Sequence, residues 1–217
     1  MAPARRSPVE DSITRTALLD ATESLMLEEG YAAVTTRRLA SKAGVNNGLV
    51  YYYFGTMDGL YIELFRRGAE RSLARLRLIL QSPQPLWALW DLTHDFSSNA
   101  LTMEFTALAN HRKAIRAEIA AYSRTFRKLE LDALTEVLKD YGVDRERWPP
   151  VSLILAMTAI SRFLQIEEDF DVTVGHAEMV AVIEREIRAL EGERRLASGH
   201  AVAGHAVAGQ GAAGQAG

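Results

Sequence analysis

The sequence predicts an all-α protein, and three observations carry this prediction. Apolar residues recur every three or four positions through most of the chain, which is the spacing of a helix with one buried face. No segment alternates apolar and polar residues in the manner of a half-buried strand. Residues that cap helix N-termini and glycines that end helices separate the periodic segments. The 217 residues suffice for one or two domains with a hydrophobic core.

Composition narrows the class of protein. The chain contains no cysteine, so it has neither disulfides nor thiolate metal sites. Its formal net charge of −3 argues against a polycation that coats nucleic acid nonspecifically. Residues 1–15 lack the apolar core of a signal peptide, and no apolar run is expected to be long enough to span a bilayer. We therefore expect a cytoplasmic protein with no membrane partner.

The N-terminal segment and the first helix differ sharply in composition. Residues 1–11 are rich in proline, arginine and serine and are expected to form a disordered arm. Within it, Arg5 and Arg6 are either solvated or in contact with phosphates or a minor groove, and we favour the solvated tail. A helix is expected over residues 13–29, with an apolar stripe of Leu18, Ala21 and Leu25. Gly30 is expected to end this helix.

The next segment predicts a helix-turn-helix. A short helix over residues 36–43 begins at a threonine cap, either Thr35 or Thr36. Gly44 follows where the chain needs a left-handed turn, and a second helix is expected over residues 46–54. Three residues have the sizes that such a motif requires. The small Ala40 permits close approach of the two helices, Gly44 makes the turn, and the branched Val50 holds the second helix against the first.

Charge is distributed locally around this motif. Arg37, Arg38 and Lys42 fall in a segment with no acid between Glu29 and Asp58. The acids of the preceding helix are expected to face away from this segment: Asp20, Glu23, Glu28 and Glu29. This pattern suits a small DNA-reading face on an acidic protein.

The rest of the chain continues as helices. A long helix is expected from Met57 to about Leu80, with Thr56 as its cap. Residues 82–85, Ser-Pro-Gln-Pro, form a boundary, and a C-terminal tail over residues 197–217 repeats HAVAG and is expected to be disordered. Between them, helices are expected over residues 86–99, 102–109, 111–141, 149–166 and 176–191.

The segment from Leu18 to Phe65 resembles the N-terminal DNA-binding module of the TetR family of transcriptional regulators. The resemblance lies in Gly30-Tyr31, TTRRLA from Thr35, AGV over residues 43–45, Gly48, Tyr51, Phe54 and Leu60. It implies a DNA-binding domain over residues 12–56 and a helical effector-binding and dimerisation domain over residues 57–196. One departure is Met57, where the family usually has a lysine that contacts phosphate, so one such contact is expected to be missing.

The resemblance and the motif together predict which residues meet DNA. The start of the recognition helix should enter the major groove, where Asn47 is expected to read a base and Asn46 to cap the helix. Leu49 either touches a thymine methyl or packs inward, and Gly48 permits close backbone approach. The predicted DNA-binding set is Thr36, Arg37, Asn46, Asn47, Gly48, Leu49, Tyr51 and Tyr52, the tyrosines and the first two residues being assigned to phosphates.

The C-terminal helices carry two further expectations. The resemblance implies a pocket for an unidentified small hydrophobic effector, and large apolar residues of these helices either line it or form plain core: Trp87, Trp90, Phe96, Met103, Phe105, Phe126 and Met157. The last two helices carry apolar stripes, which the resemblance implies form a homodimer interface, although each stripe also suits packing within the chain: Leu153, Ile160, Leu164, Val180, Ile183 and Ile187.

Enzymatic function is the rival class, and we do not expect it. Glu167, Glu168, Asp169 and Asp171 cluster in one interhelical loop without the glycine spacing of a calcium loop. No nucleophile elbow, phosphate loop or zinc signature is present, and no cofactor is expected. The expected function is that of a repressor, released from a palindromic DNA operator by its effector. The alternative is an effector-independent DNA-binding adaptor or architectural protein, which predicts a filled C-terminal core.

Overall fold

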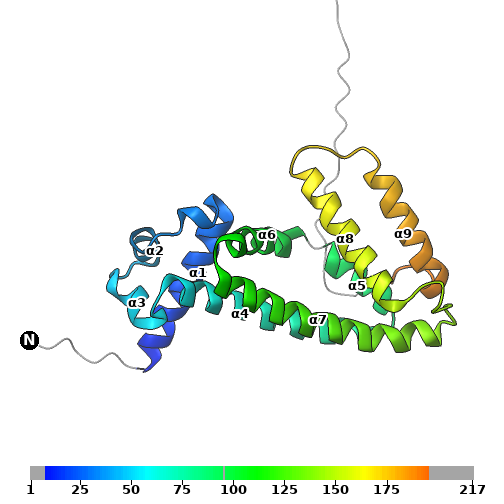
Figure 1. Cartoon of the computed structure of the whole chain (residues 1–217), viewed down its shortest axis with the longest axis horizontal. Coiled ribbons are helices and arrows are strands. Elements are labelled where there is room, and N and C mark those ends of the chain that lie inside the picture. The colour runs from blue at the N-terminus through cyan, green and yellow to red at the C-terminus, as the bar shows by residue number, and fades with distance from the viewer. Residues whose placement is uncertain (1–7, 95, 196–217) are drawn as a thin grey trace, which may run out of the picture.

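The computed structural model describes residues 8–94 and 96–195, with the side chains of residues 96–99 left aside, and this part of the chain forms helices and no strand. Figure 1 shows one end of the molecule built from α1 to α3 and the other from α5, α8 and α9, with α4 and α7 running between them. The elements are α1 (Pro8–Glu29), η1 (Tyr31–Ala33), α2 (Thr36–Ala43), α3 (Gly48–Phe54), α4 (Met57–Ile79), α5 (Pro85–Thr93), α6 (Phe96–His111), α7 (Lys113–Asp140), α8 (Pro150–Glu168) and α9 (His176–Glu191). The all-α prediction is confirmed.

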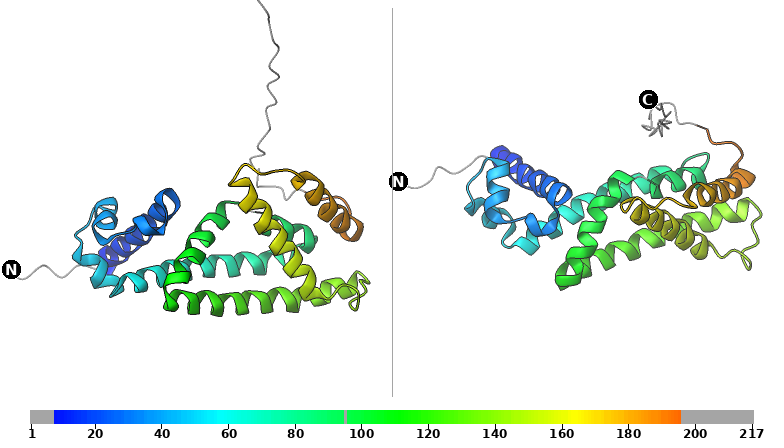
Figure 2. Two further views of the ribbon diagram at one scale, coloured as in Figure 1. Left: turned by 45° about the horizontal axis from the view of Figure 1, so that its top comes forward. Right: turned by 90° about the horizontal axis from the view of Figure 1, so that it is seen from above.

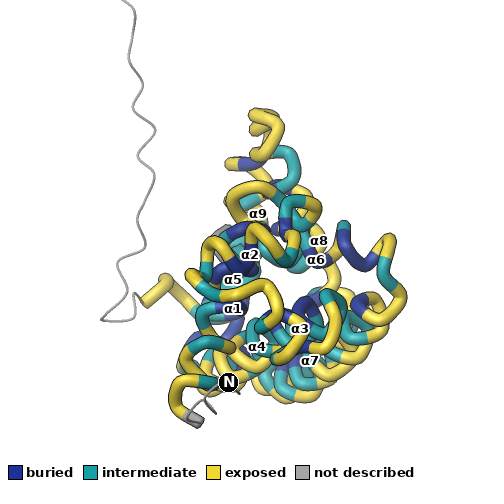
Figure 3. Tube along the Cα trace, turned by 90° about the vertical axis from the view of Figure 1, so that its left-hand side faces the viewer, coloured by how far each residue is buried: buried dark blue, intermediate teal, exposed yellow. Residues whose placement is uncertain are grey.

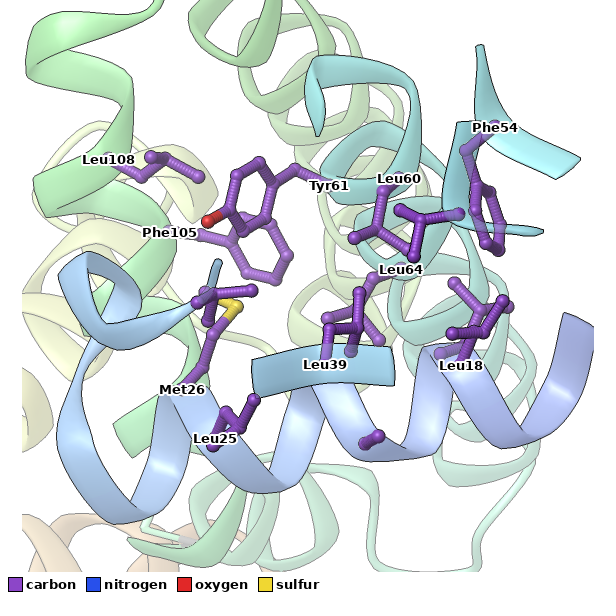
Figure 4. Packing of buried hydrophobic residues seen from close by; sticks show 14 of the residues in the cluster. Leu18, Leu25, Met26, Leu39, Phe54, Leu60, Tyr61, Leu64, Phe105 and Leu108 are labelled. Carbon is purple, nitrogen blue, oxygen red and sulfur yellow. The ribbon is translucent and has the colours of Figure 1, made fainter. Parts of the chain in front are cut away.

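Two hydrophobic cores hold these helices together. The first core joins α1, α2, α3 and the first half of α4 to α6 and the start of α7, and Figure 4 shows Leu18, Leu39, Leu64 and Phe105 meeting in it. The second core joins the end of α4 to α5, α7, α8 and α9. Both α4 and α7 contribute residues to the two cores. These two helices also pack against each other along the body of the molecule, as both views of Figure 2 show.

The first helix begins earlier than the sequence predicts. Residues 8–11, expected in a disordered arm, form the first turn of α1, while Arg5 and Arg6 lie outside the described residues. A proline is tolerated in a first helical turn because its missing N–H would have no acceptor there. Glu10 and Asp11 also favour the start of a helix through its dipole.

The break between α5 and α6 is also displaced. A single helix was predicted over residues 86–99, but α5 ends at Thr93 and α6 begins at Phe96. The Thr93 hydroxyl donates to the carbonyl of Trp90 at 2.9 Å, and His94 leaves the helical conformation. Neither glycine nor proline marks this break, so residue type gives no sign of it. The acidic segment is corrected similarly, because Glu167 and Glu168 belong to the last turn of α8.

The end of α9 is fastened to the start of α5. The Glu191 carboxylate accepts the backbone N–H groups of Leu86 and Trp87 at 2.8 and 3.0 Å. It also accepts the Tyr141 hydroxyl at 2.8 Å, and both burial and this carboxylate raise the pKa of Tyr141. The first N–H groups of a helix have no partner within that helix. The carboxylate of Glu191, the last residue of α9, therefore caps the N-terminus of α5.

α8 is an unusually apolar helix for its length. Residues 150–168 reach a mean hydropathy of 1.2 over an 18-residue window, which is long and apolar enough to cross a membrane by those criteria alone. This corrects the expectation that no such run exists. α8 packs on α5 and α7 and contributes Ile154 to the second core, while 33% of this apolar window is buried.

Candidate nucleic-acid interface

The helix-turn-helix is built as its sequence predicts, beginning with the cap of α2. Thr35, rather than Thr36, is the N-cap, and its hydroxyl accepts the N–H of Arg38 at 3.3 Å. Leu39 and Ala40 are fully buried beneath α2, so its other face is left to carry polar residues. Burial of a small side chain such as alanine allows two helices to approach closely.

The turn depends on a glycine. Gly44 has φ of 66°, in the left-handed region that side chains disfavour. The N–H of Gly44 donates to Ser41 and that of Val45 to Ala40, at 3.2 and 2.9 Å, which satisfies the last carbonyls of α2. Val50 is then fully buried and fixes α3 against the first core.

The recognition helix starts two residues later than predicted, at Gly48. Asn46 precedes the N-cap residue Asn47, and its Oδ1 accepts the N–H of Gly48, the first residue of α3, at 2.8 Å. Asn47 has helical backbone angles and makes no side-chain cap, so its amide is not used in holding the helix. Such differences of one or two residues are usual at helix ends.

One surface of this motif is exposed. Asn46, Asn47 and Gly48 are all exposed at the start of α3, and Figure 3 shows this end of the molecule facing the viewer. Tyr51 and Tyr52 are exposed to 54% and 71% of their surface. Leu49 is half-buried, which leaves open both roles considered for it.

Tyr53 belongs to neither the exposed face nor the core alone. Its hydroxyl donates to the Asp11 carboxylate at 2.7 Å, so the extra first turn of α1 lies directly against the recognition helix. The structure thus ties the N-terminal end of the described chain to α3. This contact could not be predicted from the sequence, because Asp11 was expected in a disordered arm.

The charges around α2 differ from expectation. Arg38 pairs with Glu29, and Lys42 pairs with Glu28 at 2.7 Å, so these two acids face α2 instead of away from it. Hydrogen bonds from Arg38 and Lys42 lower the pKa values of Glu29 and Glu28 respectively. Arg37 is exposed, and no ion pair involves it in the part of the chain that the structure describes. The basic character of this face therefore rests mainly on Arg37.

The entry to α4 is built around Gly59. Thr56 caps α4, its hydroxyl accepting the Gly59 N–H at 2.9 Å, and Met57 packs against the first core. A Cβ at residue 59 would lie 2.2 Å from the carbonyl oxygen of Phe54, the last residue of the recognition helix. Only glycine fits this close approach between α4 and the end of α3.

The predicted pocket residues do not gather around one cavity. Trp87 and Trp90 are fully buried in the second core, against which Phe126 and Met157 pack. Phe105 belongs to the first core, Met103 is exposed, and the side chain of Phe96 lies outside the described residues. Residue type alone identified large apolar side chains but could not distinguish the two cores.

The predicted interface stripes face mainly into the chain. Leu164 and Ile187 are buried, Ile160 is half-buried, and Leu153, Val180 and Ile183 pack against the second core. α8 and α9 carry apolar residues on a second face as well, and the spacing of apolar residues alone does not distinguish this face from the buried one. The exposed apolar residues of that face are Val151, Leu155, Phe163, Met179, Val182 and Leu190.

Comparisons with known proteins agree with this geometry. The family model described as bacterial regulatory proteins, tetR family, matches residues 18–64. The chain is 26% identical to the transcriptional repressor KstR2 of Rhodococcus jostii over 134 residues, covering 58% of this chain and 66% of that protein. It is 22% identical to the repressor BepR of Brucella suis over 202 residues, covering 85% and 97%. In fold it is similar to a TetR transcription regulator from Haloarcula marismortui, with a TM-score of 0.67, 18% identity, and coverage of 82% and 98%.

The exposed recognition helix and these relatives define a sequence-reading helix-turn-helix protein that regulates transcription by binding DNA. The capped α2, the left-handed Gly44 and the buried Val50 are the parts of that motif. Residues 18–64 match the tetR family model, and the chain is similar in sequence to two HTH-type transcriptional repressors and in fold to a TetR transcription regulator.

Proposed function

We propose that this chain acts as a homodimeric, ligand-released repressor in the cytoplasm. The observation that carries the DNA-reading part is the start of α3, where Asn46, Asn47 and Gly48 are exposed together. The Asn47 amide is oriented by no capping bond and suits bidentate contact with adenine. Thr36, Arg37, Tyr51 and Tyr52 are proposed as phosphate contacts, and Leu49 as an apolar contact to a thymine methyl.

The proposed dimer uses the exposed face of α8 and α9. Val151, Leu155 and Phe163 follow one another at four- or eight-residue steps along α8 and remain exposed. A contiguous apolar face of this kind usually marks an interface. In such a dimer the two recognition helices would occupy successive major grooves about 34–36 Å apart on a palindromic operator.

The proposed effector is a small apolar molecule that binds the helices of the second core. Trp87, Trp90, Phe126 and Met157 remain the candidate contacts there, since they gather on one core. Such a molecule releases DNA only by the amount that it prefers the non-binding conformation. α4 joins both cores and can transmit this preference.

A second candidate is a DNA-binding protein without an effector. Two tryptophans predicted to line a pocket are fully buried in packed core, which favours this alternative. Two surface hollows lie between α1 and α2 and along α7 beside Leu155, and neither is lined by the predicted pocket residues. An operator complex that small molecules from a cell extract fail to dissociate would support this alternative.

The first test is selection of bound sequences from a random duplex pool by the purified protein. A palindrome with half-sites about one helical turn apart is expected. Asn47→Ala should then relax base preference at one position of each half-site, with a cost of about 1–3 kcal/mol at that position. Unchanged preference in Asn47→Ala would show that this side chain reads no base, and no enrichment with folded wild-type dimer would reject the proposed reader.

A further inference from the structure

The corner between α6 and α7 touches the DNA-binding helices through polar groups that the proposed mechanism has not used. Tyr31 begins η1, directly after α1, and its N–H donates to the Glu104 carboxylate of α6 at 2.6 Å. The first N–H of a helical segment has no acceptor within that segment, so Glu104 supplies one. Gly30 precedes this contact with φ of 81°, and a Cβ there would lie 3.5 Å from the same carboxylate.

The carbonyl of Tyr31 is engaged as well. It accepts the hydroxyl of Tyr61, a side chain of α4 that is buried in the first core, at 3.3 Å. Figure 4 shows Tyr61 among the buried side chains of the first core, to which Phe105 of α6 also belongs. A buried phenol needs a partner for its hydroxyl, and its burial raises the pKa of Tyr61. Both polar groups of one backbone unit are therefore held by different helices.

The remaining contacts complete a polar network, called the circuit below, that consists of Glu104, Tyr31, Tyr61, Arg112 and Asp58. Arg112, between α6 and α7, places its guanidinium 5.5 Å from the centre of the Tyr61 ring and pairs with Asp58 in the first turn of α4. Asp58 lies four residues after Phe54, the end of the recognition helix. Glu104 and Arg112 thus contact the chain on both sides of the helix-turn-helix, just before α2 and just after α3.

The circuit is better suited to fixing an angle than to adding stability. The side chains of Arg112 and Asp58 are both 40% exposed, and ion pairs exposed to this degree contribute about 0–1 kcal/mol. The apolar contacts of Phe105, Leu108 and Ile115 already attach α6 and α7 to the first core. Apolar contact is non-directional, whereas hydrogen bonds to backbone groups have a preferred geometry.

We propose that Glu104 and Arg112 are positioning residues for operator recognition. They act through Tyr31 and Asp58 to hold each helix-turn-helix at one angle to the dimer body. This angle sets the separation of the two recognition helices and therefore the half-site spacing that the protein accepts. The proposal rests on the dimeric reader proposed above, and it assigns spacing selectivity to residues that touch no DNA.

The test compares affinity for three duplexes built from the palindrome recovered by selection. One has the selected spacing, one has a base pair inserted between the half-sites, and one carries a single half-site. Full-length wild type is compared with Glu104→Ala and Arg112→Ala, and with Lys113→Ala, which removes an exposed positive charge next to Arg112. Glu104→Gln keeps a side-chain acceptor, and Tyr61→Phe removes one hydroxyl while keeping the ring.

We expect Glu104→Ala and Arg112→Ala to lose most of the wild-type preference for the selected spacing. Their full-site affinity should fall roughly tenfold, because engagement of the second half-site depends on geometry. Half-site affinity should stay within about twofold, since the reading residues are untouched. Glu104→Gln and Lys113→Ala should behave as wild type, and Tyr61→Phe should show an intermediate loss.

Two results would overturn the inference separately from the proposed function. Folded, dimeric Glu104→Ala and Arg112→Ala that keep the wild-type spacing preference would show that the circuit does not set the angle. Equal losses on the half-site would show general damage to DNA reading. If either alanine variant fails to fold, Tyr61→Phe decides, and its unchanged spacing preference would count against the circuit. Wild type that shows no spacing preference would instead reject the dimeric reader.

Discussion

At the scale of single residues, two neighbouring arginines on α2 have different surroundings. Arg38 pairs with Glu29, whereas Arg37 is exposed, with no carboxylate partner among the described residues. An arginine that is not engaged in the protein is available to a phosphate without breaking an existing pair. The sequence presents both as equal members of a basic segment.

We therefore predict that Arg37→Ala weakens binding to all DNA sequences alike. The slope of log affinity against log salt concentration should fall by about one, as expected for one lost phosphate contact. Arg38→Ala is the matched control and should change the slope less, because that charge is already compensated. Titrations at several salt concentrations measure this, and equal effects of the two substitutions would contradict the assignment.

Gly59 leads to a prediction about stability. In Gly59→Ala the new Cβ would overlap the Phe54 carbonyl, so the junction between α3 and α4 must shift. We expect a loss of about 1–3 kcal/mol in the free energy of unfolding, typical of overpacking. Gly68→Ala, in the same helix with nothing within 4 Å of the added Cβ, should instead stabilise by about 0.5–1 kcal/mol. Denaturant unfolding of both variants measures the contrast, and a neutral Gly59→Ala would refute it.

At the scale of elements, α7 carries a carboxylate in its buried face. Glu130 is only 2% exposed, and it follows Tyr122 and Phe126 and precedes Leu134 on one face of the helix. Its carboxylate lies 3.4 Å from the Arg127 Nε, which is too long for a good hydrogen bond. Burial outweighs the nearby arginines and raises the pKa of Glu130 to about 7.

This pKa predicts how stability depends on pH. The folded state binds the Glu130 proton more tightly than the unfolded state, so its contribution is complete below pH 4.5 and is lost as pH rises through about 7. The loss is on the order of 3 kcal/mol, at 1.36 kcal/mol per pKa unit. Unfolding measured from pH 4.5 to 8 should show this decline in wild type and much less of it in Glu130→Gln. Glu136→Gln, on the exposed face of α7, should keep the decline; a decline unchanged in Glu130→Gln would exclude this carboxylate as its cause.

Much of the helix pattern is predictable from the sequence, because local chemistry marks it. Thr35 and Gly44 delimit α2, Thr56 caps α4, and Gly175 precedes α9, and each boundary was predicted within a residue or two. The α5–α6 break was missed because it lies at His94, which no glycine or proline marks. The separation of buried from exposed faces on α8 and α9 was missed for another reason. Both faces are apolar, so spacing alone does not say which one meets the second core.

The contacts of α6 and Arg112 with the segments around the helix-turn-helix cannot be predicted from local sequence chemistry. Glu104 and Tyr31 are 73 residues apart, and Arg112 and Asp58 are 54 residues apart. Nothing in the spacing of these residues indicates that they meet, since only the packing of α6 on the first core brings them together. The same holds for Glu28 and Glu29, whose side chains turn toward α2 because of how α1 crosses it.

At the scale of the whole molecule, the proposed dimer makes a prediction. Phe163 is 58% exposed on the second apolar face of α8. Phe163→Glu should dissociate the dimer, because burying an unpaired charge at an interface is costly. Light scattering after size exclusion should then report a monomer, with palindrome affinity close to that for one half-site. Leu78→Glu, at a residue of α4 that is 71% exposed, should remain dimeric. A dimeric Phe163→Glu would place the interface elsewhere.

The division of the molecule into two cores has a consequence for how the chain folds during synthesis. Every residue of the first core lies between Leu18 and Ile115, so the chain can complete that core while the last third is still being made. The second core needs Ile187, and the cap on α5 needs Glu191, close to the end of the described chain. Recognition helices are therefore formed on nascent chains before the surface proposed to pair them exists. Ribosome-bound chains long enough for Ile115 to have left the exit tunnel should already protect Leu39 and Val50 from the solvent, whereas protection of Trp90 should wait for release.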